Sequence, residues 1–356
     1  MAPTSILHDP YYLNTLSWSD VEALMMRSHQ VVPRCFVSKR GLMNLSSMPD
    51  SVFRRQFRFA KDDFPTLCQA LGIPKTVSSA QGVNIPGWEA LCILLRRLAY
   101  PNRLCDLELF FGRHSSVISS VTNILLERID RSFGHLLDDV SQLKWLSATD
   151  LDELSEAVYN KGAPLRNCWA FIDGTARPIC RPSQNQQEYF SGHKRLHALK
   201  YQALMCANGL ICELDGPYPG KRHDAGILFE SDLYSKLERL VGEHHYVIYG
   251  DPAYPLRHLI MKPYGGSHLT REQQNFNSAM STVRQAVEWG FGKVVSEFAF
   301  LDFKKNQKLL LQAVPKMYRV AVILINCHAC MYGNQISAYF GTEPPCLYDY
   351  LQQGSA

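Results

Sequence analysis

Three carboxylates in the second half of the sequence lie where a metal-dependent enzyme would need them. Asp173 occurs in Phe-Ile-Asp-Gly-Thr, directly after an apolar segment, and Asp251 occurs in Gly-Asp-Pro-Ala-Tyr-Pro, directly after another. Glu288 follows Val287, an apolar residue of a segment with helical spacing. Carboxylates that share a buried site repel one another unless cations neutralise them. The pattern therefore predicts a site for divalent ions.

Oxygen ligands of this kind select Mg²⁺ or Mn²⁺. Two such ions roughly 4 Å apart can activate a nucleophile and stabilise the leaving oxygen of a phosphodiester. We therefore expect two Mg²⁺ ions, or two Mn²⁺ ions, and hydrolysis of a phosphodiester bond.

Strands and a helix must bring these residues together. The strands expected from apolar and alternating segments are 168–173, 199–207, 210–214, 246–250 and 259–263. Asn208-Gly209 predicts a hairpin between the second and third strands. A helix is expected at 225–240, and a long one begins with the capping box Thr270 to Gln273. The prediction is an α/β fold with a mixed sheet and flanking helices, close to the order of ribonuclease H-like folds.

The carboxylates have predicted places in this fold. Gly174 is expected to let the chain turn after the first strand, so that Asp173 projects from the strand end. Pro252 favours an extended backbone at Asp251, which should project in the same way. Glu288 is expected to flank the helix face that packs on the sheet.

The first half of the chain has a helical period, and five regions are predicted. They are an N-terminal arm at 1–50 with a helix around Trp18 to Ser28, an all-helical domain at 51–147, a linker at 148–164 that is expected to be helical from Asp150 to Lys161, the α/β domain at 165–335 and a C-terminal tail at 336–356.

The helical domain ends in the outline of a helix-turn-helix. A short helix at 104–111 is broken by Gly112, and Ser115 is expected to cap a second helix. If this unit binds DNA, the second helix presents Ser115, Ser116, Ser119 and Thr122, with Arg113 at its start. The alternative is a packed helical hairpin with no role in DNA binding.

Composition and charge limit the class of protein. The net charge of +4 and pI near 8.4 allow a polyanionic partner without requiring one. The start of the chain does not resemble a secretory or transit signal, and no apolar run is long enough for a membrane span. Eleven scattered cysteines are typical of reduced thiols in the cytosol or nucleus. Four basic residues lie beside the acidic motifs: Lys194, Arg195, Lys221 and Arg222. They are expected either to bind phosphates or to be solvated surface charges.

Four segments resemble one known family. FIDGT, GKRHDA, GDPAYP and VEWGFG, in this order between about 165 and 330, are similar to the DDE endonuclease domain of PIF/Harbinger transposases and their domesticated relatives. The resemblance implies that Asp173, Asp251 and Glu288 are the catalytic metal ligands, and that Asp224 joins them. Where relatives often have a basic run, this chain continues with Lys293-Val-Val-Ser-Glu-Phe, which weakens the case for DNA contacts there.

The resemblance implies a nuclear enzyme that cuts transposon ends and joins the freed 3′-hydroxyl to target DNA, with a Myb-like DNA-binding partner. The cytoplasm remains a second location, and self-association remains open. A domesticated DNA-binding or assembly protein with dispensable catalysis is the alternative, and a phosphoesterase for small substrates is a third. Residue by residue, Asp173 and Asp251 could merely form turns, Asp224 could cap a helix, and Glu288 could pair with Arg284.

Overall fold

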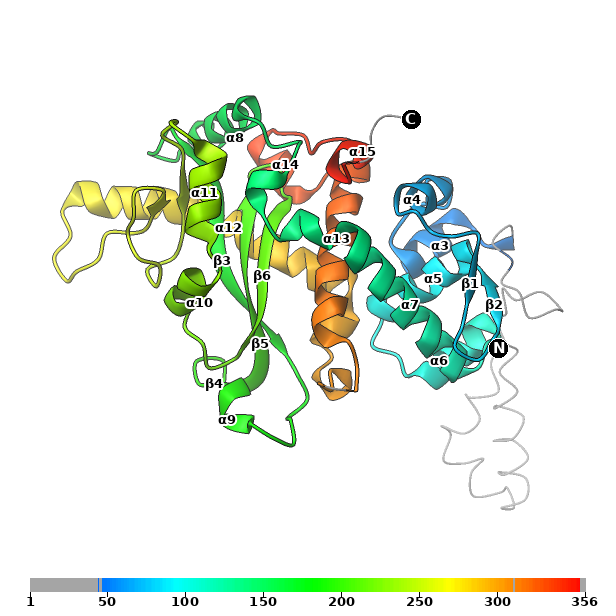
Figure 1. Cartoon of the computed structure of the whole chain (residues 1–356). Coiled ribbons are helices and arrows are strands. Elements are labelled where there is room, and N and C mark those ends of the chain that lie inside the picture. Colours follow the sequence, from blue (N-terminus) through cyan, green and yellow to red (C-terminus); the bar gives the residue numbers. More distant parts are fainter. Residues whose placement is uncertain (1–43, 45–46, 310, 353–356) are drawn as a thin grey trace, which may run out of the picture.

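The computed structural model describes residue 44, residues 47–309 and residues 311–352 of the 356-residue chain (Figure 1). The helix predicted around Trp18 to Ser28 lies outside the described residues. The first part of the described chain is helical, with one small hairpin. Its elements are α3 (Asp50–Phe57), α4 (Phe64–Ala70), β1 (Thr76–Ser78), β2 (Asn84–Pro86), α5 (Gly87–Ala99), α6 (Leu104–Phe111) and α7 (Ser115–Phe133).

The helical region is built around α5 and α7. Nearly all of α5 is buried, including the charged residues Glu89 and Arg97, and α7 packs along it. Gly112 ends α6 in the left-handed conformation with φ of 64°, which glycine adopts without strain. The predicted pair of helices around Gly112 is therefore present. One detail of the prediction is wrong, since His114 and not Ser115 caps α7.

The segment predicted as a linker, 148–164, contains the helix α8 (Ala148–Asn160). Two short helices, η3 (Gly134–Leu137) and η4 (Val140–Gln142), precede this segment. Leu151, Leu154 and Val158 of α8 are buried, and the helix packs on the first strand of the sheet. The predicted tail likewise contains α14 (Gln335–Phe340) and α15 (Leu347–Tyr350), which pack through apolar side chains. Both segments thus contribute to the folded core.

The sheet has mixed direction, as predicted. Its strands are β3 (Cys168–Pro178), β4 (Phe190–Ser191), β5 (Leu196–Cys206), β6 (Ile211–Pro219), β7 (Val247–Tyr249) and β8 (Ile260–Met261). Strand β5 lies between β6 and β3 and is antiparallel to both, whereas β3, β7 and β8 are parallel neighbours. Gly209 turns the predicted hairpin with φ of 79°. The predicted order is confirmed for the five expected strands, but the single helix expected at 225–240 is two helices, which are separated at Ser231 and Asp232.

Helices cover both faces of the sheet. The remaining elements are α9 (Gln186–Tyr189), α10 (Asp224–Glu230), α11 (Leu233–Val241), α12 (Arg271–Glu297), η5 (Ala299–Asp302), η6 (Lys304–Asn306) and α13 (Val314–Tyr332). Gln202 of β5 donates to Ser231, between α10 and α11, whereas Tyr201 stacks on Tyr318 of α13. Because successive side chains of a strand point to opposite faces, α10 and α11 lie on one face and α13 lies on the other.

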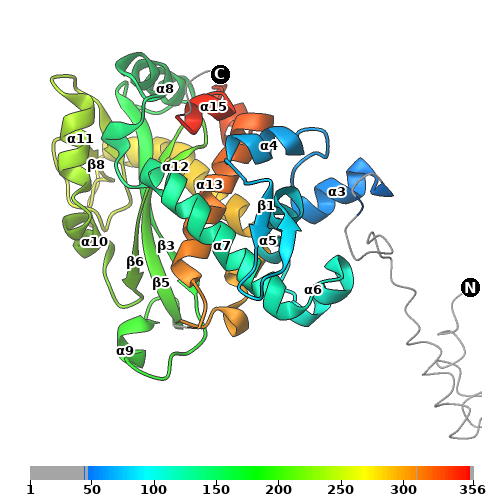
Figure 2. The same ribbon diagram turned by 45° about the vertical axis from the view of Figure 1, so that its right-hand side comes forward.

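The long helix α12 joins α13 on its face of the sheet. Thr270 and Gln273 form the predicted capping box at its start. Gly290, in the VEWGFG motif, lets α12 approach β5 closely, because an added Cβ would lie only 2.0 Å from Cε of Met205. Figure 2 shows α7 and α13 between the sheet and the other helices of the helical region, and the buried side chains of both regions form one hydrophobic cluster. The predicted boundary at 147 is therefore not marked by a break in the core.

His328 of α13 lies where the helical region meets this layer. Its ring is 5.6 Å from the ring of Phe59 and 4.8 Å from that of Tyr332. Burial lowers the pKa of His328 to about 4, and the positive charges of Lys293 and Arg54 act in the same direction. The carboxylate of Glu297 partly opposes them.

We expect acid to destabilise the protein through His328. Its unfolded pKa is near 6.5, so between pH 6.5 and 4 the unfolded chain binds the proton and the folded chain does not. Stability from this group is therefore present above pH 6.5 and decreases as the pH falls. Urea unfolding should give a free energy about 1 to 1.5 kcal/mol lower at pH 5.5 than at pH 8. The variant His328→Gln should lose this part of the pH dependence; an unchanged slope would exclude His328 as its source.

Candidate active site

Asp173 lies inside β3 and not at its end, so that part of the prediction is wrong. The strand continues to Pro178 because β5 pairs with it along this whole stretch, and Asp173 is opposite Ala203. Gly174 has an ordinary strand conformation and makes no turn. Residues directly opposite in an antiparallel pair share a face. Asp173 therefore faces the layer of α12 and α13, together with Ala203.

Arg284 of α12 joins Asp173 to Glu288. Its guanidinium Nη1 donates to Oδ2 of Asp173 at 3.2 Å, and its Nη2 lies 3.7 Å from Oε1 of Glu288 one turn later. The ion pair between Arg284 and Glu288 considered from the sequence is thus present. The Glu288 side chain is 64% exposed, whereas that of Asp173 is 18% exposed. Two of the three predicted ligands are therefore on the same face, with a cation between them.

Asp224 lies on the other face of β3. It begins α10, and Lys200 of β5 donates to its Oδ1 at 3.1 Å. A Cβ added to Gly174 would lie 2.8 Å from the same oxygen, so only glycine at this position lets Asp224 come this close. The glycine of the DGT motif is explained by this contact.

Asp251 follows β7 after one residue, Gly250, close to its predicted place at the strand end. Its Oδ1 accepts a hydrogen bond from the backbone of Ala253 at 3.0 Å, which fixes a tight turn. The ring of Tyr254 then folds back on Gly250, where an added Cβ would lie 2.7 Å from the ring. The Tyr254 hydroxyl is buried without a hydrogen-bond partner. The motif thus places a buried hydroxyl without a hydrogen-bond partner near enough to the carboxylates of Asp173, Asp224 and Asp251 for their charges to act on it.

The three aspartates influence one another electrostatically. Burial raises the pKa of Asp173 to about 6, Arg284 and the Gly174 amide oppose this change, and Asp251 and Asp224 add to it. The same three carboxylates raise the pKa of Tyr254, after burial as the main cause. The structure therefore brings Asp173, Asp224 and Asp251 into one electrostatic cluster, while Glu288 connects to it through Arg284.

Carboxylate oxygens are the donors that Mg²⁺ and Mn²⁺ prefer, so the residues of the cluster fit such ions in their chemistry. Within the described residues, however, no three acidic, histidine or cysteine side chains are close enough to hold one ion. Lys200 and Arg284 instead neutralise two of the carboxylates. Shared coordination by Asp173, Asp251 and Glu288 stays a prediction, and Asp224 as a further ligand does too.

Comparison with known proteins gives a match over the region that contains this cluster. Residues 172–326 match the family described as DDE superfamily endonuclease. The match covers a little under half of the chain and contains Asp173, Asp224, Asp251 and Glu288. The mixed α/β architecture is compatible with the fold of such nucleases. Comparisons with curated proteins and with solved structures gave no match.

The matched region points to a nuclease or transposase. In the described part of the chain, no helix has the length and apolar character to cross a membrane. The helical region with α6 and α7 lies outside the match, so a helix-turn-helix function for it stays a prediction.

The residues predicted to contact DNA from α7 have other partners in the structure. Arg113 forms two hydrogen bonds to the buried carboxylate of Glu89, at 3.0 and 3.2 Å. The Ser115 amide donates to Glu108, and the Ser116 hydroxyl contacts His114. Ser119 is partly exposed in a groove beside the β1–β2 hairpin.

Thr122 was predicted to face outward, and this is wrong. It is buried and donates to the carbonyl of Ile118, as threonine commonly does inside a helix. Of the four hydroxyl residues predicted to be presented by α7, only Ser115, Ser116 and Ser119 are therefore partly exposed.

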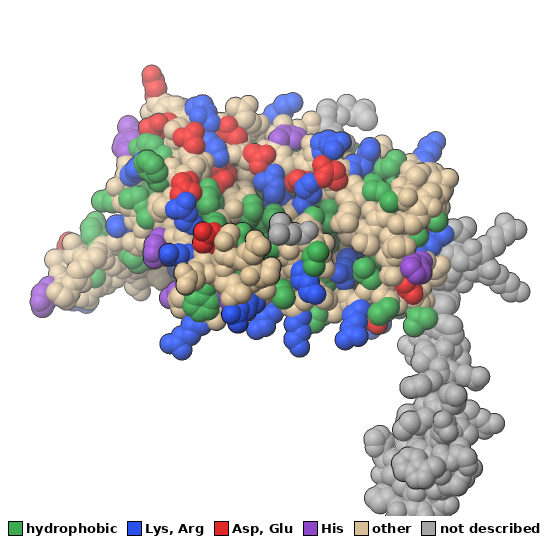
Figure 3. Space-filling model, turned by 60° about the horizontal axis from the view of Figure 1, so that its bottom comes forward, with side chains coloured by type: hydrophobic (Ala, Val, Ile, Leu, Met, Phe, Trp, Pro, Cys, Tyr) green, Lys and Arg blue, Asp and Glu red, His purple; other side chains and the backbone are tan. Residues whose placement is uncertain are grey.

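Cationic loops lie at one end of the sheet. Lys194 and Arg195 are exposed in the turn before β5, and Lys221 and Arg222 are exposed before α10, where Arg222 pairs with Glu230. The amide of Cys180, after β3, donates to the carbonyl of Gln307, which brings the lysine-rich η6 segment to the same end. Figure 3 views this end and shows Lys and Arg side chains gathered along its edge.

Sequence reasoning missed two functional candidates. Arg284 was considered only as a partner of Glu288, although four-residue spacing on a helix also allowed it to reach a carboxylate on the sheet. Tyr254 was treated as motif context, and its burial depends on a fold of the turn that sequence alone does not give.

Proposed function

We propose that this chain is a divalent-metal-dependent DNA endonuclease and strand transferase of the PIF/Harbinger type. The observation that carries the proposal is the cluster of Asp173, Asp224 and Asp251, joined through Arg284 to Glu288, inside a region that matches DDE endonucleases. The order of the strands supports a ribonuclease H-like fold for this region. DNA is the substrate, and the nucleus is the place of action.

In this proposal Asp173, Asp251 and Glu288 hold two divalent ions, with Asp224 beside them. When bound, the ions supply an activated water and stabilise the leaving oxygen of the phosphodiester. Before the ions bind, Arg284 compensates the negative charges of Asp173 and Glu288 and keeps both side chains on the same face of the sheet. Lys200 does the same for Asp224. These two cations are then available to phosphate oxygens, since each already points into the cluster.

The exposed basic residues hold the DNA backbone in this proposal. Lys194, Arg195, Lys221 and Arg222 flank β5 and α10, the elements that carry Lys200 and Asp224. The helix-turn-helix around Gly112 supplies a second contact through Ser116 and Ser119. A Myb-like partner protein finds the transposon ends, and the chain works as a homo-oligomer.

One observation favours a second candidate, a domesticated DNA-binding or assembly protein whose catalysis is dispensable. Glu288 is largely exposed and paired with Arg284, and the carboxylates do not converge on a common point. In that case the chain would bind DNA and leave it uncut, whatever metal is supplied.

Nicking of supercoiled plasmid DNA tests the first candidate. We expect relaxed circles with Mg²⁺ or Mn²⁺ and none with EDTA, because the carboxylates need bound ions to act on a phosphorus centre. A small phosphodiester such as bis(p-nitrophenyl) phosphate should be cleaved far more slowly than DNA, since it cannot reach the basic loops. The test also uses DNA that contains the sequences flanking the gene of this protein, and it is repeated with a co-expressed Myb-like partner.

Two results would contradict this assignment. Stable DNA binding without cleavage in either metal identifies the domesticated protein. Fast cleavage of the small ester at a rate equal to that of DNA identifies a phosphoesterase for small substrates.

A further inference from the structure

Helix α8 presents an acidic surface at the end of the sheet opposite the cationic loops. The helix contains no Lys or Arg, and with the nearby Glu343 it forms a surface that we call the α8 acidic surface. Its carboxylates belong to Asp150, Asp152, Glu153, Glu156 and Glu343. None of the ion pairs in the described part of the chain involves one of them. The negative charge of this surface is therefore uncompensated within the chain.

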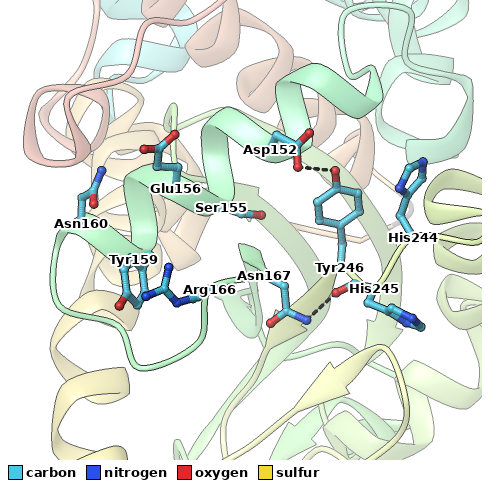
Figure 4. Close-up of a pocket in the computed structure, with 10 residues that line it drawn as sticks. All are labelled: Asp152, Ser155, Glu156, Tyr159, Asn160, Arg166, Asn167, His244, His245 and Tyr246. Carbon is cyan, nitrogen blue, oxygen red and sulfur yellow. Dashed lines mark hydrogen bonds between the residues drawn. The ribbon is translucent and has the colours of Figure 1, made fainter.

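A pocket of about 690 Å³ opens along one side of α8 (Figure 4). Asp152, Ser155, Glu156 and Tyr159 of α8 line it on one side. The opposite side consists of the segments that lead into β3 and β7, including Asn167 and Tyr246. A second hollow, of about 440 Å³, lies on the other flank of α8 and shares Glu156 with the first. The acidic helix thus forms a ridge between two polar grooves.

The first groove contains a polar group that the fold leaves unused. Ser155 is only 3% exposed, and its hydroxyl has no hydrogen-bond partner. A buried hydroxyl without a partner is unfavourable by about 1 to 3 kcal/mol, so it normally has one. Asp152, by contrast, accepts a hydrogen bond from the Tyr246 hydroxyl at 2.6 Å, which fixes its carboxylate at the rim. The groove is therefore prepared for a ligand that donates hydrogen bonds.

The cations near the groove are held on aromatic rings. The guanidinium of Arg166 lies 4.4 Å from the ring centre of Tyr159, and the ammonium of Lys161 lies 5.1 Å from that of Tyr339. Arg166 also lines the groove, but among the described residues neither it nor Lys161 forms an ion pair with the carboxylates of α8. The carboxylates of this surface repel nucleic acid and attract cationic groups.

We propose that the α8 acidic surface binds a lysine- and arginine-rich segment of a partner protein. Charge complementarity selects the occupant, and the groove on each flank gives room for an extended chain. Asp152 and Glu156 are about 6 Å apart along the helix, which is close to the spacing of alternate residues in an extended peptide. Basic residues at alternate positions therefore fit the ridge best, and the Ser155 hydroxyl accepts from one of them.

This surface leaves the predicted DNA site free. Tyr246, in the groove, precedes β7, whereas Asp251 follows the same strand, so the two sites lie at opposite ends of it. Figure 1 shows the same separation, with α8 at one end of the sheet and β4 and α9 at the other. The chain can thus hold a basic partner and DNA together. The inference does not depend on nuclease activity.

Fluorescence anisotropy with labelled peptides tests the proposal on the full chain. The probe is a twelve-residue peptide with Lys or Arg at alternate positions and Ser between them. The comparison peptide has Gln in place of every basic residue. We expect saturable binding of the first and none of the second, and weakening of about tenfold or more in Asp152→Asn/Glu156→Gln.

Two further variants make the result specific. Ser155→Ala should weaken binding about threefold and raise thermal stability, because it removes a buried hydroxyl that has no partner in the chain. Glu238→Gln/Glu272→Gln removes the same charge from exposed positions outside the surface and should bind as the unmutated chain does. Equal weakening by both double variants would show binding to net charge alone and overturn the proposal.

Three other outcomes also overturn it. Competition between duplex DNA and the peptide would place them at one site. A change of sedimentation coefficient in Asp152→Asn/Glu156→Gln without peptide would identify a second copy of this chain as the occupant. Absence of peptide binding at low ionic strength, where such contacts are strongest, would show that the surface is merely solvated.

Discussion

Replacing Asp173 or Glu288 should abolish metal-dependent nicking of DNA. The variants Asp173→Asn and Glu288→Gln keep the size of each side chain and remove its charge. Each should lower the rate of nicking by on the order of 10²- to 10³-fold, the size expected when one preorganised charge is removed from a catalytic site. Quantitative gel analysis of plasmid nicking under Mg²⁺ measures the effect.

The two variants should differ in stability, which separates their roles. Asp173 is buried near two other aspartates, and its pKa is raised to about 6, so at neutral pH Asp173→Asn removes an unfavourable charge and should raise the melting temperature. Glu288 is exposed, so Glu288→Gln should unfold like the unmutated protein. Gln285→Ala, at an exposed neighbouring position on α12, is the control for both. Nicking at equal rates by all of these proteins would remove the acidic residues from the mechanism.

The sequence predicted the elements of the α/β region well because their signals are local. The Asn208-Gly209 turn needs only its own two residues, and the capping box at Thr270 needs only four. The length of β3 was underestimated for the opposite reason. Pairing with β5 as far as Pro178 is a tertiary contact, and it overrides the glycine at 174 that suggested a turn.

The sequence selected the members of the candidate site by motif order, but it did not give their geometry. Motif order selected Asp173, Asp224, Asp251 and Glu288, all of which lie in the matched region. Asp173 and Asp224 lie on opposite faces of β3. This arrangement depends on the register between β3 and β5, which decides which residues of each strand face which layer of helices. The roles of Lys200 and Arg284 as counter-charges follow from the same register and could not be read from the spacing alone.

Arg113 shows why a basic residue at the start of a helix is weak evidence for DNA binding. It was predicted to contact DNA, yet its guanidinium bonds to both oxygens of Glu89, whose side chain has no exposed surface. A buried carboxylate needs such a partner, because an uncompensated charge inside the protein is strongly unfavourable. The bidentate pair anchors α7 on α5 and so fixes the arrangement of the helical region.

Arg113→Met should therefore destabilise the protein by about 3 to 5 kcal/mol, since it leaves Glu89 buried and charged. Denaturant unfolding followed by circular dichroism measures this loss. Arg131 of α7 forms an ion pair with Glu127, and its side chain is 77% exposed. Arg131→Met should therefore change the free energy of unfolding by less than about 0.5 kcal/mol.

The double variant Glu89→Met/Arg113→Met should recover most of the loss, because apolar side chains of similar size can replace a buried ion pair. If Arg113→Met instead keeps its stability and loses affinity for DNA, the guanidinium serves DNA binding and not the fold. These variants thus decide whether Arg113 serves the fold or DNA binding, because the two interpretations predict opposite results.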